Sequence, residues 1–222
     1  MEENIQSIKK SIGVREAVAF GWEKVRERIL FFAAVTFISY SLANIIMSLN
    51  LIAGAMEGAL VSLIRLVGWL IYVFIYFFLM AGLITILLKT VKGESSSLRD
   101  FLNKQKYVFP ILAGYFLYFL IIAIGSLFLI IPGIFLAMRL SFVLLLIIDK
   151  SMGPITALKE SYRLTKGYGW KLFLLAFIVG PLLFIVGVLA FLVGSFIVPP
   201  IFLLAWTFFY DRIITLKLEL TH

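Results

Sequence analysis

Three ionisable residues stand inside apolar stretches or at their ends, where a charged side chain needs a partner. Arg139 follows Pro132 by seven residues, or about 10 Å along a helix, and Asp149 ends the same stretch. Asp211 lies in the last apolar stretch beside Arg212. Because a charge at membrane depth is costly unless it is paired or serves a function, we predict that Arg139, Asp149 and Asp211 form a ligand site or a buried ion pair.

Two roles are open to Arg139. A guanidinium matches phosphate or carboxylate in two-point geometry, so Arg139 could contact an anion or a lipid headgroup inside a cavity. Alternatively, it ties the spans together through backbone carbonyls or a buried salt bridge, with Asp211 reached by a few ångströms of snorkelling. The sequence leaves both roles open.

Residue combinations typical of enzymes are missing. The sole histidine is His222 and cysteine is absent, so the chain has no histidine base within the apolar stretches and no cysteine nucleophile. Neither a glycine-rich phosphate loop nor zinc-ligand spacing occurs in the sequence. We therefore expect no enzymatic activity, no cofactor and no metal site.

Composition indicates a membrane protein. Apolar residues make up 63% of the 222 residues and charged residues 14%, against about 45–50% and about 25% in soluble domains. The formal charge is +8, but the basic residues alternate with apolar and aromatic ones such as Trp22 and Phe101. This pattern favours an anionic inner leaflet as the partner, rather than nucleic acid.

Lysine and arginine are confined to four segments, apart from Arg65 and Arg139. The four segments are residues 1–28, 89–106 and 150–171 and the last eleven residues. A helix needs about 20 residues to cross the hydrocarbon layer, and the apolar stretches between the basic segments divide into six such spans. We place them near residues 29–52, 59–88, 108–130, 132–149, 171–193 and 196–216.

The distribution of basic residues predicts the orientation of these spans. Basic segments remain in the cytoplasm, so the prediction is a multi-pass cell-membrane protein with both termini cytoplasmic. We predict a single all-α membrane domain over residues 1–222, with short outer connections at residues 54–58, 131–133 and 194–200. The glycine-proline pair at residues 180–181 is expected to interrupt the fifth span.

Each cytoplasmic segment before a pair of spans has apolar residues three and four apart, which predicts an amphipathic interfacial helix. These helices are expected within residues 1–28, 97–109 and 154–166. In the third, Ile155, Leu158, Ser161, Tyr162 and Thr165 are expected on one face, and the basic residues Lys159, Arg163 and Lys166 on the other. A threefold repeat of helix and hairpin is one reading of this order, and chance similarity is the other. The helices could simply anchor the bundle, or they could contact anionic lipid or a cytoplasmic protein.

The segment from Ile130 to Phe142, then Asp149, then the segment from Gly153 to Gly167 resembles the signature of a group of prokaryotic membrane proteins. That group includes the membrane domain attached to some glycerophosphoryl diester phosphodiesterases and related stand-alone proteins of unknown function. The resemblance implies a six-span helical architecture. In the enzyme members, the chemistry resembles that of a separate soluble barrel domain, which this sequence lacks, so no catalytic residue is carried over.

Two functions are compatible with these expectations. In the first, the bundle encloses a cavity around Arg139 and handles or transports a lipid, an amphiphile or a small anion within the bilayer. In the second, the chain is a non-catalytic scaffold or regulatory module that binds a cytoplasmic or membrane partner. We take the first as the prediction and keep the second as the alternative. The sequence leaves the substrate and the oligomeric state open.

Overall fold

The computed structural model describes residues 13–54, 58–97, 99–100, 105–128, 130–189 and 191–219. These residues form helices and turns with no strand among them, which confirms the all-α class for this part of the chain. Within it, five helical segments are long and apolar enough to cross a membrane, and they overlap the second to sixth predicted spans. The five segments are Leu60–Val91, Val108–Leu127, Ile131–Asp149, Gly169–Val186 and Phe196–Lys217.

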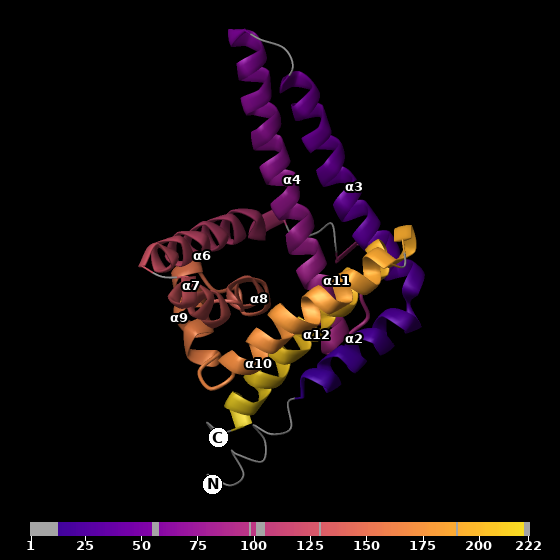
Figure 1. The fold of residues 1–222 in the computed structure, drawn as a ribbon, viewed down its shortest axis with the longest axis vertical. Helices are drawn as coiled ribbons and strands as arrows, with labels where there is room; N and C mark the ends of the chain where they lie inside the picture. Colours follow the sequence, from indigo (N-terminus) through magenta and orange to yellow (C-terminus); the bar gives the residue numbers. More distant parts are fainter. Residues whose placement is uncertain are drawn as a thin grey trace.

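The first predicted span falls on α3 (Ile29–Gly54), whose described apolar segment, Ile29–Ser39, is shorter than a bilayer crossing. The sixth crossing therefore stays a prediction. α3 pairs with α4 (Ala59–Val91) in a hairpin that projects from the remaining helices (Figure 1). α4 has 33 residues, or about 50 Å of helix. This length exceeds the hydrocarbon thickness of about 30 Å, in agreement with the long second span. Residues 55–57 of the predicted connection lie outside the described residues.

The amphipathic helix expected near the start of the chain is α2 (Val14–Glu27), and residues 1–12 of that segment lie outside the described residues. α2 buries Ala17, Gly21 and Val25 and packs along α12 (Phe191–Glu219). A methyl group at Gly21 would lie 2.4 Å from the Ile201 carbonyl oxygen. This helix is therefore part of the packed core as well as a carrier of surface charge.

The helix expected at residues 97–109 lies only partly within the described residues, since residues 98 and 101–104 are outside them. Within it, a short 3-10 turn, Gln105–Tyr107, leads directly into α6 (Val108–Phe128). α6 runs across the direction of α4 (Figure 1). The candidate spans are therefore not all parallel to one another, as they would be in a simple bundle of helical hairpins.

α6 and α7 (Ile130–Arg139) form a second, tighter hairpin. A methyl group at Gly133 would come within 2.0 Å of Ser126 Oγ, so only glycine permits this approach. The predicted turn at residues 131–133 is wrong by a few residues, because those residues already belong to the first turn of α7. Proline is tolerated there, since the N–H groups of a first turn have no intrahelical partner.

The predicted fourth span is not a continuous helix. α7 ends at Arg139, residues 140–142 form a turn, and α8 (Val143–Asp149) follows. The helix α9 (Pro154–Leu164) supplies the missing hydrogen bonds. Ser161 Oγ donates to the Arg139 carbonyl at 3.0 Å and accepts from the Phe142 N–H at 3.1 Å. Because buried backbone groups need partners, α9 makes this break possible.

The last hairpin consists of α10 (Gly169–Leu174), a π-helical stretch at Leu175–Val179, α11 (Gly180–Leu189) and α12. The π turn directly precedes Pro181, and the Gly180 N–H bonds the Leu175 carbonyl. Since proline removes one helical hydrogen bond, this irregularity matches the interruption expected at residues 180–181. The predicted connection at 194–200 is wrong: α12 begins at Phe191 and contains Pro199 and Pro200.

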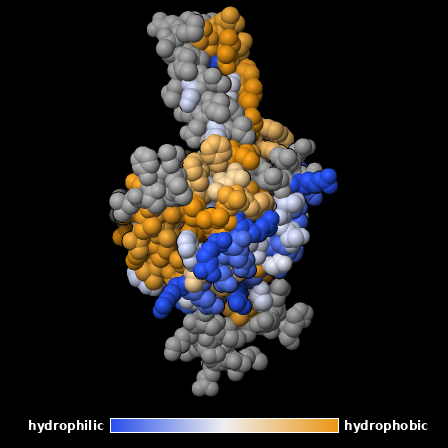
Figure 2. Space-filling view, turned by 90° about the vertical axis from the view of Figure 1, so that its right-hand side faces the viewer, coloured by the Kyte–Doolittle hydropathy of each residue, from blue (hydrophilic) through white to orange (hydrophobic). Residues whose placement is uncertain are grey.

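Apolar side chains cover much of the outer surface, notably on α4, α6 and α11. Leu127 is 84% exposed and Phe184 is 70% exposed. On the face that carries α2, hydrophilic residues gather toward the end of the molecule where α12 ends, with apolar surface beside and above them (Figure 2). A surface so apolar suits contact with lipid rather than water, and its polar end suits a membrane boundary.

Candidate functional site

Asp149 is the centre of an ion-pair cluster that joins three helices. Its Oδ1 accepts a hydrogen bond from Lys92 Nζ, just after α4, and its Oδ2 accepts one from Tyr210 OH on α12 at 2.9 Å. Lys150 Nζ lies 3.6 Å from Oδ2. The Asp149 side chain is only 5% exposed, so the carboxylate is buried with both oxygens bonded. We name these four residues the Asp149 cluster.

Asp211 lies beside the Asp149 cluster and not beside Arg139. It is close enough to Lys92, Asp149 and Lys150 to interact with each electrostatically. Among the described residues, no ion pair joins Asp211 to Arg139. The predicted pairing of these two residues is therefore not made, because the α7–α8 break turns Arg139 toward α9.

Arg139 lies between two aromatic rings. Its Cζ is 5.1 Å from the centre of the Phe135 ring on α7 and 4.8 Å from that of the Tyr162 ring on α9. The residue is partly exposed, but its Nε and Nη1 atoms are buried and have no hydrogen-bond partner within the described part of the chain. The rings stabilise the cation through their faces, while these two donor atoms stay unsatisfied.

The backbone carbonyl of Arg139 is hydrogen-bonded, whereas two donor atoms of its side chain are not. The Arg139 carbonyl accepts from Ser161 Oγ at 3.0 Å and from Thr165 Oγ1 at 2.9 Å. These hydroxyls lie four residues apart on one face of α9, as helical geometry requires. They fix the end of α7 against α9, so the position of the guanidinium does not depend on an ion pair.

Basic residues gather around Lys217, which lies within electrostatic reach of Arg139. Lys217, near the end of α12, is close enough to interact electrostatically with Arg139, Arg163, Lys166 and Glu160. The Glu160 carboxylate is engaged by Arg163 at 2.9 Å, and this bond raises the pKa of Arg163. We name Arg139, Arg163, Lys166 and Lys217 the Arg139 cluster. Among the described side chains of this region, the Glu160 carboxylate is paired with Arg163, and Lys217 Nζ donates to the Arg163 carbonyl at 2.6 Å.

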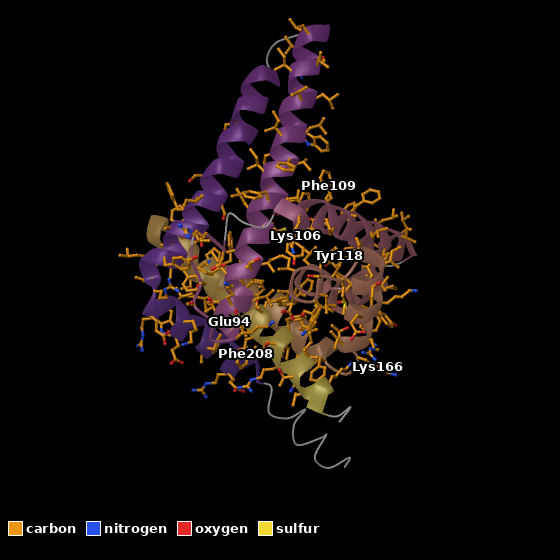
Figure 3. The ribbon with its side chains drawn as sticks, turned by 180° about the vertical axis from the view of Figure 1, so that it is seen from behind. Glu94, Lys106, Phe109, Tyr118, Lys166 and Phe208 are labelled. Atoms are coloured by element: carbon orange, nitrogen blue, oxygen red, sulfur yellow. The ribbon has the colours of Figure 1, made fainter. Side chains whose placement is uncertain are left out.

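The predicted basic residues of α9 lie on its outer surface. Lys159, Arg163 and Lys166 are all exposed, and Figure 3 shows Lys166 near the end of the molecule where α12 ends. The predicted apolar face is partly wrong: Ile155 is 64% exposed and Tyr162 is 46% exposed. Leu158, Ser161 and Thr165 are buried as predicted, and Ala157 and Leu164 are buried with them. Tyr162 therefore faces Arg139 from the rim of α9.

Several residues of both clusters were not anticipated as site residues. Lys92 and Tyr210 complete the Asp149 cluster, and Phe135 and Tyr162 enclose Arg139. Phe135 precedes Arg139 by four residues, which is a helical signal that could have identified it. The other three come from separate helices, and nothing in their local sequence indicates the contact.

A smaller polar contact lies after the end of α4. Lys89 Nζ lies 2.7 Å from Asp100 Oδ1, and Asp100 Oδ2 accepts from the Ser97 N–H at 3.0 Å. The bond from Lys89 lowers the pKa of Asp100 below its ordinary value. The described residues contain no group of three acidic or histidine side chains placed to hold a metal ion.

Comparisons with known proteins give no match: no family model, no curated protein and no solved structure matches this chain. The resemblance to the phosphodiesterase-associated membrane group therefore stays a prediction.

Proposed function

We propose that this chain is an integral membrane protein that binds an anionic ligand at Arg139 and handles it within the bilayer. The ligand is a lipid, an amphiphile or a small anion. One observation carries the proposal: two buried nitrogen atoms of the Arg139 guanidinium have no partner within the described residues. Unmade hydrogen bonds of a buried charged group are costly. An anionic ligand satisfies those donors once the partly exposed side chain turns them toward the surface.

The neighbours of Arg139 support a ligand rather than a structural salt bridge. No carboxylate pairs with Arg139 among the described residues, and the nearby Glu160 is already bound by Arg163. Lys217 adds a second cation beside the guanidinium. Like charges held together repel, so the cluster gains stability when an anion is bound. Phosphate and carboxylate both suit a guanidinium.

The proposed topology has six spans, with α3 as the first and both termini in the cytoplasm. Two of the basic segments that border the candidate spans meet in space, since Lys92 and Lys150 both lie on Asp149. Because the sequence has no cysteine, single introduced cysteines report topology directly. We expect Lys159→Cys to resist, and Ser62→Cys to accept, an impermeant thiol reagent applied to intact cells. The reverse pattern would overturn the orientation.

The scaffold function remains a second candidate because the outer face of α9 is exposed and basic. An acidic partner protein would suit Lys159, Arg163 and Lys166. If this function holds, reversing those three charges removes a co-purifying protein, whereas Arg139→Ala leaves that protein bound. If the charge reversal weakens lipid binding and no partner is lost, the first function is favoured.

Thermal unfolding of the purified chain in neutral detergent tests the anion site. We expect phosphatidylglycerol to raise Tm for the parent chain and to have little effect on Arg139→Ala. Arg212→Ala is the matched control, since Arg212 also lies over an aromatic ring, that of Phe208 at 5.2 Å, but belongs to the exposed surface of α12. The proposal is wrong if Arg139→Ala and Arg212→Ala respond to the lipid as the parent does.

A further inference from the structure

Arg139 ends an exposed stripe along one face of α7. Ile131, Phe135 and Arg139 follow each other at intervals of four residues, so they lie on the same side of the helix. Ile131 is 77% exposed and Phe135 is 51% exposed. From Ile131 to Arg139 the stripe extends about 12 Å. An apolar track therefore leads along the helix to an unsatisfied guanidinium.

Next to the stripe, α9 and the turn after it expose an aromatic residue and basic residues. The Tyr162 ring covers the guanidinium of Arg139, and Lys159 and Lys166 lie three and four residues from Tyr162 on the exposed side of that helix. The order along this surface is apolar, then cationic and aromatic, then cationic again. A phospholipid offers matching groups in this order: an acyl chain for the apolar part, a phosphate for the guanidinium and a headgroup for the last part.

We propose, on the basis of the proposed function, that the ligand of Arg139 is a single anionic phospholipid. Its acyl chain lies along Ile131 and Phe135, its phosphate accepts hydrogen bonds from the Arg139 guanidinium, and its headgroup lies against Tyr162 and Lys166. The phosphate binds the exposed part of the guanidinium, and a turn of the side chain brings to it the two buried donor atoms that no described residue satisfies.

The apolar part of the stripe distinguishes a lipid from a free anion. A soluble phosphate would bind the guanidinium alone and would leave Ile131 and Phe135 uncovered. A lipid also covers these two exposed side chains, and apolar contact adds affinity in proportion to the buried area. We therefore expect the long-chain lipid to bind much more tightly than inorganic phosphate.

The charges around the site distinguish an anionic lipid from a zwitterionic one. Lys217 lies within electrostatic reach of Arg139, and Arg163 and Lys166 lie within electrostatic reach of Lys217. The quaternary ammonium of phosphatidylcholine would be repelled by them, whereas phosphatidylglycerol carries no cation. Neutral diacylglycerol offers the acyl chains without the phosphate. These three lipids therefore separate the contributions of phosphate, headgroup charge and chain.

Native mass spectrometry or lipid titration of the full chain in neutral detergent tests this assignment, with phosphatidylglycerol, phosphatidylcholine, diacylglycerol and inorganic phosphate as probes. Ile131→Ser removes part of the track at an exposed position, and Ile185→Ser on α11, where Ile185 is 53% exposed, is the matched control. We expect Ile131→Ser to weaken phosphatidylglycerol binding about tenfold, the equivalent of losing a buried branched side chain, and Ile185→Ser to have no effect.

The outcomes separate the two proposals. If Arg139→Ala abolishes binding, but Ile131→Ser has no effect and phosphate binds as well as the lipid, the site takes a small anion and the lipid assignment is wrong. If no probe binds the parent chain more tightly than Arg139→Ala, the anion site itself is wrong. If diacylglycerol binds as tightly as phosphatidylglycerol, the phosphate contact is wrong.

Discussion

Asp149 and Arg139 lie ten residues apart on either side of the α7–α8 break, yet their charges have opposite surroundings. Both oxygens of Asp149 accept hydrogen bonds, and two lysines lie beside them. Arg139 has two buried nitrogen atoms that donate no hydrogen bond to any described residue, and the cation of Lys217 lies within electrostatic reach of it. The first arrangement connects α4, α8 and α12. In the second, two donor atoms of the guanidinium bind no described residue.

This difference separates a structural charge from a candidate binding charge. A buried ion pair with all its hydrogen bonds made is strongly destabilised when one partner is removed. A cation without an anionic partner loses little when it is replaced by an apolar side chain, because it contributes no ion pair. Substitutions in the two clusters should therefore differ in size, and in whether their effect depends on added lipid.

The largest effect is expected for Asp149→Ala. It removes the acceptor of Lys92 and Tyr210 and should lower the free energy of unfolding by about 3 kcal/mol, measured by reversible unfolding in mixed micelles. Asp211→Ala is the control, since Asp211 forms no ion pair within the described residues, and it should cost less. Equal effects of the two substitutions would contradict the structural role of Asp149.

A smaller effect, of opposite sign, is expected for Lys217→Glu. This change places a carboxylate near Arg139, within electrostatic reach of its guanidinium, and should stabilise the lipid-free chain by about 1 kcal/mol. The same carboxylate should compete with phosphatidylglycerol and weaken its binding. Lys217→Met removes the positive charge without supplying a carboxylate or amide acceptor for Arg139. If it gives the same stability as Lys217→Glu, the expected pairing with Arg139 does not form.

Arg139→Leu should change the stability of the lipid-free chain by less than about 1 kcal/mol. Leucine retains apolar contact with Phe135 and Tyr162 and removes the unsatisfied donors, while the cation–π contacts are lost. The variant should lose its response to phosphatidylglycerol. A destabilisation as large as that of Asp149→Ala would mean that Arg139 has a structural partner, and the comparison between the clusters would fail.

The smallest effect concerns Asp100, which is paired with Lys89 near the surface. Lys89 holds the pKa of Asp100 below its ordinary value of 3.8. This contribution to stability is therefore complete above that value and is lost as the pH falls through the lower, folded-state pKa. Because Asp100 is partly exposed to solvent, the pair contributes only about 0.5 kcal/mol. The difference in unfolding free energy between the parent and Asp100→Asn, measured from pH 6 to pH 3, should shrink below pH 4.

Particular residues show how far the sequence could predict this arrangement. Apolar length and the grouping of lysine and arginine predicted the all-α class and located five candidate spans, because both signals are local. The turn positions were less accurate: Pro199 and Pro200 were expected between two spans and lie inside α12. Proline is tolerated in an apolar helix when its surroundings satisfy the freed carbonyls.

The site was predicted only in part. Arg139 and Asp149 were identified because a charge in an apolar stretch is visible in the sequence. The expected Arg139–Asp211 pair assumed an unbroken fourth span. The hydroxyls of Ser161 and Thr165, which stabilise the break, belong to another helix, and hydrogen bonds between helices leave no periodic trace in the sequence.

The sequence by itself determined which residues are apolar enough to enter a membrane and which charges stand among them, since both depend on residue type alone. Only the tertiary structure decided how each charge is surrounded. It placed Lys92 and Tyr210 on Asp149, and it placed Tyr162 and Lys217 beside Arg139. The physical reason is that an ion pair or an unsatisfied donor depends on the distance between atoms of different helices, which the packing of the helices determines.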